Sequence, residues 1–237
     1  MKFLYRYRVM LGVLSLTLAV TFTIVICFFA LSRTTAEAQR LTVVLDAGHG
    51  GIDGGVVGIE SGKKESDINL EITFMLQERF EEAGFNVVLT RKTEAGLYGT
   101  ATTGYKKRDM KKRAEIINRS NPALVISVHQ NFFLNHSRRG AQVFFREDSP
   151  LSVALAGSIQ NSLNSMPECV KQLQSLKGDY YILNCNDFAS VIVECGFLSN
   201  AEDEALLLSD NYRRKLVEAI FSGALTYLSA SAGVSSS

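Results

Sequence analysis

Short apolar runs of β-prone residues alternate along this chain with segments whose apolar residues recur at helical spacing, and this alternation restricts the possible fold most strongly. The expected strands cover residues 41–45, 85–89, 124–128, 141–145, 180–183 and 190–193. Ser149 and Pro150 are expected to begin a helix as its N-cap and first residue, and residues 164–178 to be irregular. A further helix is expected over residues 199–228. Strands that alternate with helices predict an α/β domain with a largely parallel sheet.

The N-terminal segment has a different character. Residues 9–31 form an uncharged apolar run, preceded by Lys2, Arg6 and Arg8. The run is long enough to cross a bilayer as a helix, and the basic residues before it favour an N-terminus on the cytoplasmic side. Residues 36–38, Ala-Glu-Ala, resemble a signal-peptide cleavage site, but secretory apolar segments are usually shorter, so an uncleaved membrane anchor is preferred. In either case residues 1–38 are a signal or anchor segment, and the remainder is expected to be exported.

Residues 39–229 are expected to form a single globular domain, followed by a disordered tail at residues 230–237. The whole chain holds 25 Lys and Arg residues and 24 Asp and Glu residues, but five basic residues and one acidic residue lie in residues 1–40. The exported part therefore carries a net charge of about −3, which argues against a general binder of nucleic acid or other polyanions.

Cysteine spacing excludes two further classes of protein. Cys27 lies in the apolar N-terminal run, and Cys169, Cys185 and Cys195 show no C-x-x-C spacing. This pattern fits neither a disulfide framework nor a cysteine zinc site. Buried free thiols are expected, with a Cys169–Cys185 disulfide as the alternative.

A glycine-rich loop follows the first expected strand. Asp46 ends the strand, and residues 48–55 contain five glycines with His49 among them. Glycines allow tight turns and the close approach of a ligand, so this loop is a candidate site at the C-terminal end of its strand. A phosphate-binding loop is the alternative, but the dinucleotide pattern G-x-G-x-x-G fails at Asp53 and the phosphate-loop lysine is absent.

Three ionisable residues, His49, His129 and Glu194, lie just past expected strands, and Glu65 lies in the expected loop before the first helix of the domain. In a mainly parallel sheet the C-terminal ends of the strands share one edge, so these residues can converge. Two histidines and a carboxylate are the ligand set of many hydrolytic zinc sites. A further carboxylate nearby can take a proton from water and deliver it to a leaving group.

Each of these residues has an alternative explanation. Glu65 can be a surface charge beside Lys64, and Asp67 competes with it as the ligand. The third histidine, His136, lies in a polar loop and is expected to be non-catalytic. Glu194 is harder to explain without a function, because a carboxylate that ends a buried strand is costly unless it is paired or coordinated.

These segments together resemble the type-3 zinc-dependent N-acetylmuramoyl-L-alanine amidases. The resemblance lies in LDAGHGGIDGG, ESDINL, SVHQN and VIVECGFLSN, and it covers residues 41–228 in order and at suitable spacing. It implies that His49, Glu65 and His129 are zinc ligands and that Glu194 is the catalytic carboxylate. It also implies a single domain with a twisted, mixed sheet of about six strands flanked by helices, with the zinc site at the strand C-terminal edge.

Other positions agree with this family or depart from it. Arg113 and Asn118 match an arginine and an asparagine of the helix before the second histidine strand. Ala47 stands where the family often has proline, and residues 130–132, Gln-Asn-Phe, replace the usual Ala-Asn-Ala. The single domain, the apolar N-terminal segment and the GYKKRDM stretch are most similar to the CwlD-type sporulation amidases. That similarity implies removal of stem peptides on the way to muramic-δ-lactam in the spore cortex.

The expected activity is zinc-dependent hydrolysis of the amide between N-acetylmuramic acid and L-alanine in peptidoglycan, in the cell wall or the forespore intermembrane space. An activating protein partner is also considered. One alternative is a zinc carboxypeptidase that acts within the stem peptide. It would need a cation for the terminal carboxylate, for which Arg91, Arg138 and Arg139 are candidates. The other alternative is a non-catalytic wall-binding protein with the same fold.

A basic cluster completes the set of candidate features. Six Lys and Arg residues fall between Lys106 and Arg113. A solvated helix face is the simpler explanation for this cluster. The functional alternative is contact with an anionic wall polymer or with lipid headgroups.

Overall fold

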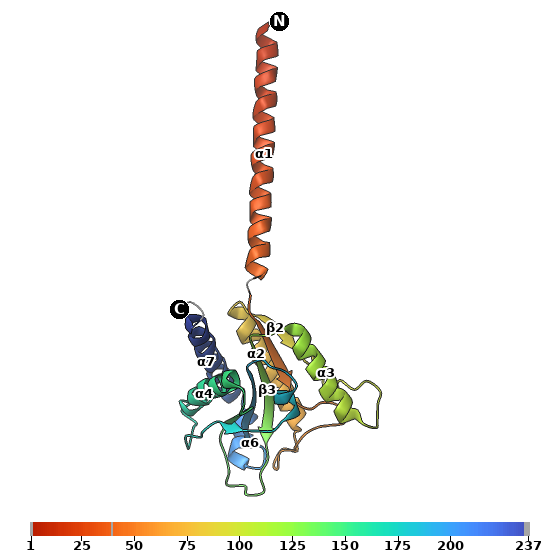
Figure 1. The fold of residues 1–237 in the computed structure, drawn as a ribbon, viewed down its shortest axis with the longest axis vertical. Helices are drawn as coiled ribbons and strands as arrows, with labels where there is room; N and C mark the ends of the chain where they lie inside the picture. Colours follow the sequence, from red (N-terminus) through yellow and green to blue (C-terminus); the bar gives the residue numbers. More distant parts are fainter. Residues whose placement is uncertain (1, 39, 235–237) are drawn as a thin grey trace. The chain divides into compact units, whose positions relative to one another are not determined.

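The structure, a computed structural model, describes residues 2–38 and 40–234 (Figure 1). The chain divides into two units, residues 1–40 and residues 41–237. In the first unit, α1 (Lys2–Ala38) is one continuous helix. Its segment Met10–Phe29 has a mean hydropathy of 2.4 and is long and apolar enough to cross a membrane, properties that a signal sequence shares.

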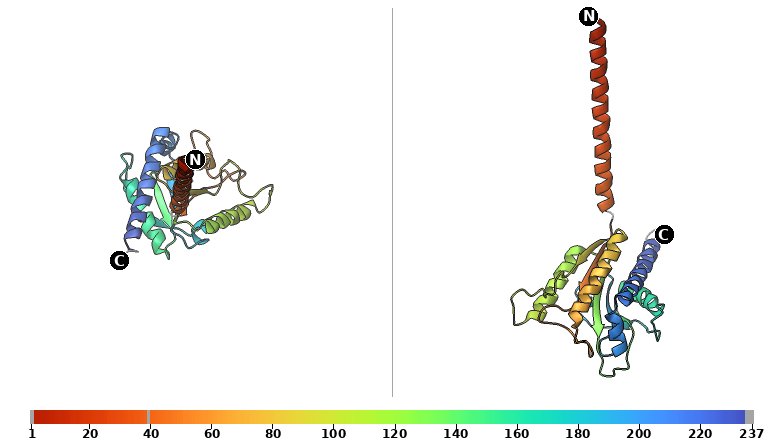
Figure 2. Two further views of the ribbon diagram at one scale, coloured as in Figure 1. Left: turned by 90° about the horizontal axis from the view of Figure 1, so that it is seen from above. Right: turned by 180° about the vertical axis from the view of Figure 1, so that it is seen from behind.

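Within residues 41–234, the second unit is built on a six-stranded sheet with strand order β2-β1-β3-β6-β4-β5 (Figures 1 and 2). The strands are β1 (Thr42–Ala47), β2 (Asn86–Leu89), β3 (Leu124–Asn131), β4 (Gln142–Phe145), β5 (Leu176–Lys177) and β6 (Ser190–Phe197). β2, β1, β3 and β6 run parallel, whereas β4 is antiparallel to β6 and pairs with β5 at the edge. The expected α/β fold with a mainly parallel, mixed sheet is confirmed.

Helices cover both faces of this sheet. They are α2 (Glu65–Glu82), α3 (Tyr105–Ser120), α4 (Pro150–Asn164), α5 (Tyr181–Asn184), α6 (Ala201–Leu207) and α7 (Asp210–Val234). α2, α4 and α7 pack on one face, and α3 and α5 pack on the other (Figure 2). Because side chains alternate along a strand, Val43 and Leu45 of β1 join the larger core with α2, α4 and α7, whereas Val44 joins the smaller core with α3 and α5.

Several expected elements differ from the structure. β3 and β6 extend to Asn131 and Phe197, so His129 and Glu194, expected just past the strands at 124–128 and 190–193, lie within them. Residues 180–183, expected to be a strand, contain most of helix α5, in which the neighbouring Ile182 and Leu183 are both buried. A short apolar run does not distinguish a strand from a buried helical turn, so the sequence pattern predicted the wrong element here. Residues 164–178, expected to be irregular, contain the two-residue strand β5.

The C-terminal helical region is divided in two. α6 and α7 replace the single helix expected over residues 199–228, and the side chain of Asn200 caps α6 by accepting hydrogen bonds from two backbone N–H groups of its first turn. α7 continues to Val234, so residues 230–234, expected to belong to a disordered tail, are helical. Residues 235–237 lie outside the described residues.

Two local expectations concern a helix start and a disulfide. Ser149 caps α4 by accepting a hydrogen bond from the backbone N–H of Ser152, with Pro150 at the first helical position, which confirms the expected start. All four cysteines are free, so the alternative of a Cys169–Cys185 disulfide is wrong.

Candidate active site

The loop after β1 holds His49 at the C-terminal edge of the sheet. Arg91 and Arg113, both buried, donate hydrogen bonds to the backbone carbonyl oxygens of residues 47–49. These bonds hold His49 in the left-handed region of backbone conformation, at φ 61°. Arg91 also donates to the carbonyl oxygen of Ser66 in the first turn of α2, at 2.7 Å. The two segments that present His49 and Glu65 are thereby tied together by one guanidinium group.

Glu65 is the first residue of α2 rather than part of the preceding loop, and its side chain is buried. Its Oε1 lies 3.3 Å from His49 Nε2 and 2.9 Å from His129 Nδ1. The backbone N–H of Val56 donates to Oε2 at 2.9 Å, and that of Gln130 donates to Oε1 at 3.1 Å. Burial alone would raise the pKa of Glu65, but its contacts with His129 and His49 lower that pKa, so the carboxylate is ionised.

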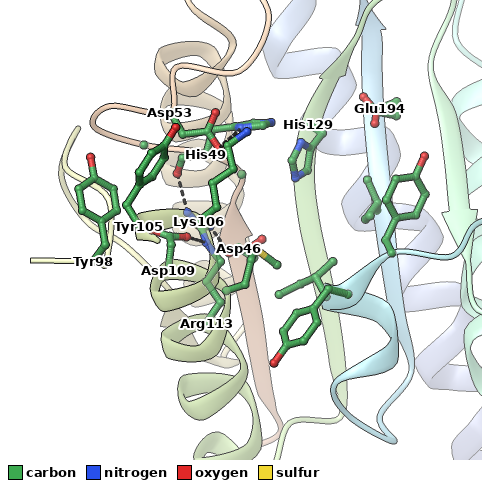
Figure 3. A pocket seen from close by; sticks show the side chains of 17 residues that line it. Asp46, His49, Asp53, Tyr98, Tyr105, Lys106, Asp109, Arg113, His129 and Glu194 are labelled. Carbon is green, nitrogen blue, oxygen red and sulfur yellow. Dashed lines mark hydrogen bonds and ion pairs between the residues drawn. The ribbon is translucent and has the colours of Figure 1, made fainter. Parts of the chain in front are cut away.

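His129 and Glu194 come from neighbouring strands. They are register partners on β3 and β6, so their side chains lie at the same level of the sheet, as Figure 3 shows. Both line the cavity on the side of α3 and α5. Gly48 packs against His129 so closely that a Cβ at position 48 would lie 2.3 Å from the imidazole ring. This position therefore needs glycine.

Glu194 differs from the other acids of the site in the surroundings of its carboxyl group. Its Oε2 is buried and has no hydrogen-bond partner among the described residues. Burial raises the pKa of Glu194 to about 7, and the negative charge of Glu65 adds to this effect, while His129 and His49 oppose it. A carboxyl group with a pKa near neutrality can both accept and release a proton at neutral pH.

His49, Glu65 and His129 form a group that can hold a metal ion. One ligand atom from each lies within 4.8 Å of the others. Two ligands of a tetrahedral zinc ion, at bond lengths of roughly 2.0–2.2 Å, are separated by about 3.3–3.6 Å. The separation of 3.3 Å between His49 Nε2 and Glu65 Oε1 fits this spacing, whereas His129 Nδ1 and Glu65 Oε1 are closer, at the 2.9 Å of a direct hydrogen bond. Two imidazoles and a carboxylate are also a donor set that suits zinc, with one position left open.

Other residues considered with this group lie outside it. The carboxylate of Asp67 accepts a hydrogen bond from the Ser66 hydroxyl at 3.3 Å and is not part of the metal-binding group. His136 is exposed in the segment after β3, where its ring lies beside that of Phe132. Asn118 donates to the carbonyl oxygen at the C-cap of α5 and does not line the cavity.

A cavity of about 220 Å³ opens in front of His129 and Glu194 (Figure 3). Its aromatic lining comes from Tyr98, Tyr105, Tyr180 and Tyr181. Its further charged lining comes from Asp46, Asp53, Lys106, Asp109 and Arg113. The cavity therefore combines the two histidines of the metal-binding group with aromatic walls and with both signs of charge.

Sequence reasoning missed Asp53 and Lys106 as site residues. Asp53 Oδ2 lies 3.2 Å from His49 Nδ1, and Lys106 Nζ lies 3.7 Å from the same oxygen. Burial lowers the pKa of His49, but Glu65 and Asp53 raise it further than burial lowers it. The sequence carried little signal for these contacts, because a spacing of four residues has no fixed geometry in a glycine-rich loop.

Asp46 lies at the base of the cavity in a buried polar network. It accepts hydrogen bonds from Thr90 at 2.6 Å, Ser127 at 2.5 Å and Arg113 at 2.5 Å. Burial alone would raise the pKa of Asp46, but the Arg113 guanidinium and the two hydroxyl groups lower it to about 2. Arg113 also pairs with Asp109, one turn earlier on α3. The network joins β1, β3, α3 and the residue that follows β2 beneath the site.

We expect Asp46 to make stability depend on pH. Its pKa of about 2 in the folded state lies below its ordinary value of 3.8, so its contribution is present above the ordinary value and is lost as the pH falls toward 2. The difference corresponds to about 2 kcal/mol of unfolding free energy. Denaturant unfolding of metal-free protein from about pH 5 to pH 2 should show a smaller loss of unfolding free energy for Asp46→Asn than for the unmodified chain. Asp187→Asn, at a fully exposed carboxylate, should lose as much unfolding free energy as the unmodified chain. If the unfolding free energy of Asp46→Asn depended on pH as it does in the unmodified chain, the prediction would be wrong.

Comparison with known proteins agrees with this geometry. A family model described as N-acetylmuramoyl-L-alanine amidase matches residues 43–226, a range that includes both histidines and both carboxylates of the site. The germination-specific N-acetylmuramoyl-L-alanine amidase of Bacillus subtilis is 33% identical over 190 residues, which cover 78% of this chain and 78% of that protein. The amidase AmiA of Escherichia coli is 25% identical over 239 residues, which cover 82% of this chain and 78% of that protein.

Solved structures show the same similarity. The CwlD amidase from Clostridioides difficile, determined in complex with the GerS lipoprotein, is 37% identical with a TM-score of 0.78. That match covers 81% of this chain and 100% of the CwlD chain. An N-acetylmuramoyl-L-alanine amidase from Clostridium difficile 630 is 26% identical with a TM-score of 0.73, covering 80% of this chain and 97% of that chain.

Proposed function

Because this chain belongs to the N-acetylmuramoyl-L-alanine amidase family, we propose that it cleaves its substrate with a zinc ion held by His49, Glu65 and His129 and with Glu194 as the catalytic carboxylate. The bond cleaved by this family is the amide between N-acetylmuramic acid and the L-alanine of peptidoglycan. One observation carries the proposal. Three side chains able to bind a metal converge from the β1 loop, α2 and β3, beside a carboxyl group whose buried oxygen has no partner among the described residues.

Glu194 moves the proton in this scheme. A bound zinc ion would polarise the scissile carbonyl and lower the pKa of a water molecule to roughly 7. Glu194 accepts a proton from the attacking water and returns it to the amine of the departing L-alanine. Burial favours the protonated form of Glu194, which suits both steps, because the carboxyl group must bind the proton after attack and release it before the product leaves. One water is consumed, and the products are a muramic acid carboxylate and a stem peptide with a free amine.

Asp53 supports His49 in this role. Its Oδ2 lies 3.2 Å from His49 Nδ1, so the proton of the imidazole is held on Nδ1. Nε2, which faces Glu65, is then free to bind a metal. A carboxylate behind a ligating histidine is common at metal sites, where it fixes the tautomer and the orientation of the ring.

The contacts of three arginines argue against a carboxypeptidase that acts within the stem peptide. Arg91 is bound to backbone carbonyl groups behind the site, Arg139 pairs with two carboxylates of α6, and Arg138 lies over the Phe133 ring at 4.5 Å. None of the three is among the described residues that line the cavity. Family membership and the assembled site together argue against a non-catalytic wall-binding protein.

Digestion of purified peptidoglycan followed by mass spectrometry tests this function. We expect new L-alanine amines together with peptide-free muramic acid, a loss of activity with a chelator, and its return with zinc. Muramoyl peptides that have lost C-terminal residues would instead indicate a carboxypeptidase. Intact peptidoglycan with bound protein would indicate a binding protein.

We further propose that this chain acts on cortex peptidoglycan during sporulation. Its relative in Bacillus subtilis is germination-specific, and its structural relative CwlD was determined with a lipoprotein. Removal of the stem peptide frees the lactyl carboxylate of muramic acid, which is the group that closes the ring of muramic-δ-lactam. Spores that lack this chain should therefore lack the lactam and retain stem peptides, and a normal lactam content would contradict this role. A protein partner, for which a lipoprotein is the first candidate, should co-purify with the tagged chain.

We expect α1 to anchor the chain in a membrane. Met10–Phe29 has the length and hydropathy of a spanning helix. Full-length protein should therefore sediment with membranes and stay there after a carbonate wash, whereas a variant without residues 1–38 should be released. A soluble form that begins near Gln39 would instead show cleavage after residues 36–38.

A further inference from the structure

We propose that Lys106 recognises the carboxylate of the second stem-peptide residue and makes the enzyme selective for stems in which that carboxylate is not amidated. The inference rests on the amidase function proposed above. In peptidoglycan the second stem residue is a glutamate joined through its side chain, so its α-carboxyl group is either free or present as an amide. Lys106 would distinguish the charged form from the neutral form.

The position of Lys106 fits a carboxylate one residue beyond the scissile bond. Lys106 is in the first turn of α3 and lines the cavity together with His49, His129 and Glu194. Its Nζ and His49 Nδ1 contact the same oxygen of Asp53, at 3.7 and 3.2 Å, so the two nitrogens lie within about 7 Å of each other (Figure 3). Two extended residues span at most about 7 Å. The metal would bind Nε2, across the ring from Nδ1, which places it about 4 Å farther away and so within about 11 Å of Lys106 Nζ. The span of two residues, extended by an ammonium–carboxylate contact of about 3 Å, brings this carboxylate close to Lys106 when the scissile bond lies at the metal-binding group.

Lys106 is also free to change partner. Its side chain is 68% exposed and its contact with Asp53 is long, so this ion pair holds the ammonium group weakly. Arg113, the other cation among the described residues that line the cavity, is buried and bound to Asp46, Asp109 and backbone carbonyl groups. Lys106 is therefore the cation that a substrate can engage.

The charges of the cavity explain why such a cation is needed. Arg113 pairs with both Asp46 and Asp109 and offsets only one of their two negative charges, and Asp53 adds a further negative charge near the path of the substrate. A carboxylate that enters beside them is repelled unless a cation meets it. An amidated stem carries no charge at this position and gains less from Lys106, since it lacks the charge–charge attraction between an ammonium group and a carboxylate.

Two matched muramoyl peptides test the assignment, one with a carboxylate and one with an amide at the second residue. Binding is measured on the full-length chain carrying Glu194→Gln, so that neither ligand is consumed. We expect this protein to bind the acid roughly two- to five-fold more tightly than the amide, the usual contribution of an exposed ion pair. Adding Lys106→Gln should bring the ratio close to one, and Lys106→Arg should preserve it. Lys107→Gln, which removes an exposed charge next to Lys106 but outside the cavity lining, should also preserve it.

The outcomes separate two kinds of failure. Equal binding of acid and amide before the Lys106 substitution, or a ratio that persists in Lys106→Gln, overturns the assignment. Turnover with Glu194 intact tests the amidase separately. A protein that binds the acid selectively but releases no L-alanine amine from either peptide would refute the proposed chemistry while supporting the role of Lys106.

Discussion

Replacement of Glu194 by glutamine is expected to lower peptidoglycan turnover by roughly a hundred-fold to ten-thousand-fold, the usual contribution of a positioned general base. Glutamine keeps the size of the side chain but cannot accept the proton of the attacking water. The proposed metal ligands are His49, Glu65 and His129, so the variant should fold, hold zinc and still bind peptidoglycan. Zinc content, sedimentation with peptidoglycan and release of L-alanine amines measure the three properties separately.

Cys195→Ala is the matched control for this substitution. Cys195 follows Glu194 on β6, but its side chain is buried in the larger core on the opposite face of the sheet. Its loss should lower the free energy of unfolding by about 1 kcal/mol and leave turnover nearly unchanged. Loss of zinc from Glu194→Gln would make Glu194 a metal ligand, and near-normal turnover of that variant would refute its proposed role.

Replacement of His129 by alanine is expected to remove both the metal and the activity. The unmodified protein should contain about one zinc ion per chain. Without the imidazole, His49 and Glu65 alone leave the ion with two protein ligands, too few for a stable site. Zinc content measured by mass spectrometry of metals, together with turnover, tests this expectation. His136→Ala, at an exposed histidine outside the group, should keep both, and full zinc content in His129→Ala would remove His129 from the ligand set.

Substitutions of Glu65 and Asp67 form a matched pair that tests which of the two carboxylates is the metal ligand. Glu65→Ala should empty the metal site, whereas Asp67→Ala should not, because Glu65 Oε1 lies between the two histidines and Asp67 is outside the group. The reverse result would move the ligand by two positions along α2.

The convergence of the main site residues was predictable because it follows from topology. His49 follows β1, His129 and Glu194 lie in the C-terminal halves of β3 and β6, and the three strands are neighbours in a parallel arrangement. Once the strands are predicted from the sequence, the sheet edge that they share brings these residues together, independently of the conformation of the loops. Glu65 was placed in a loop instead of the first turn of α2, but its position in the chain still brought it to that edge.

The contacts around the site were not predictable in the same way, because they depend on how each helix is rotated. The basic cluster at residues 106–113 was one feature in the sequence, yet α3 buries Arg113, exposes Lys107 to solvent and leaves Lys106 beside the cavity. Arg91 was one of the candidate cations for the terminal carboxylate of a substrate. Its four backbone carbonyl partners come from three separate segments, and local sequence contains no signal for such a contact.

The two outer strands of the sheet bear on how the protein behaves at high local concentration. β2 is four residues long and β5 is two residues long. An edge strand carries a row of unpaired N–H and C=O groups with which another chain can pair, and a longer edge gives a longer template for aggregation. Folded copies crowded together outside the cytoplasm therefore offer one another very little backbone for edge-to-edge association.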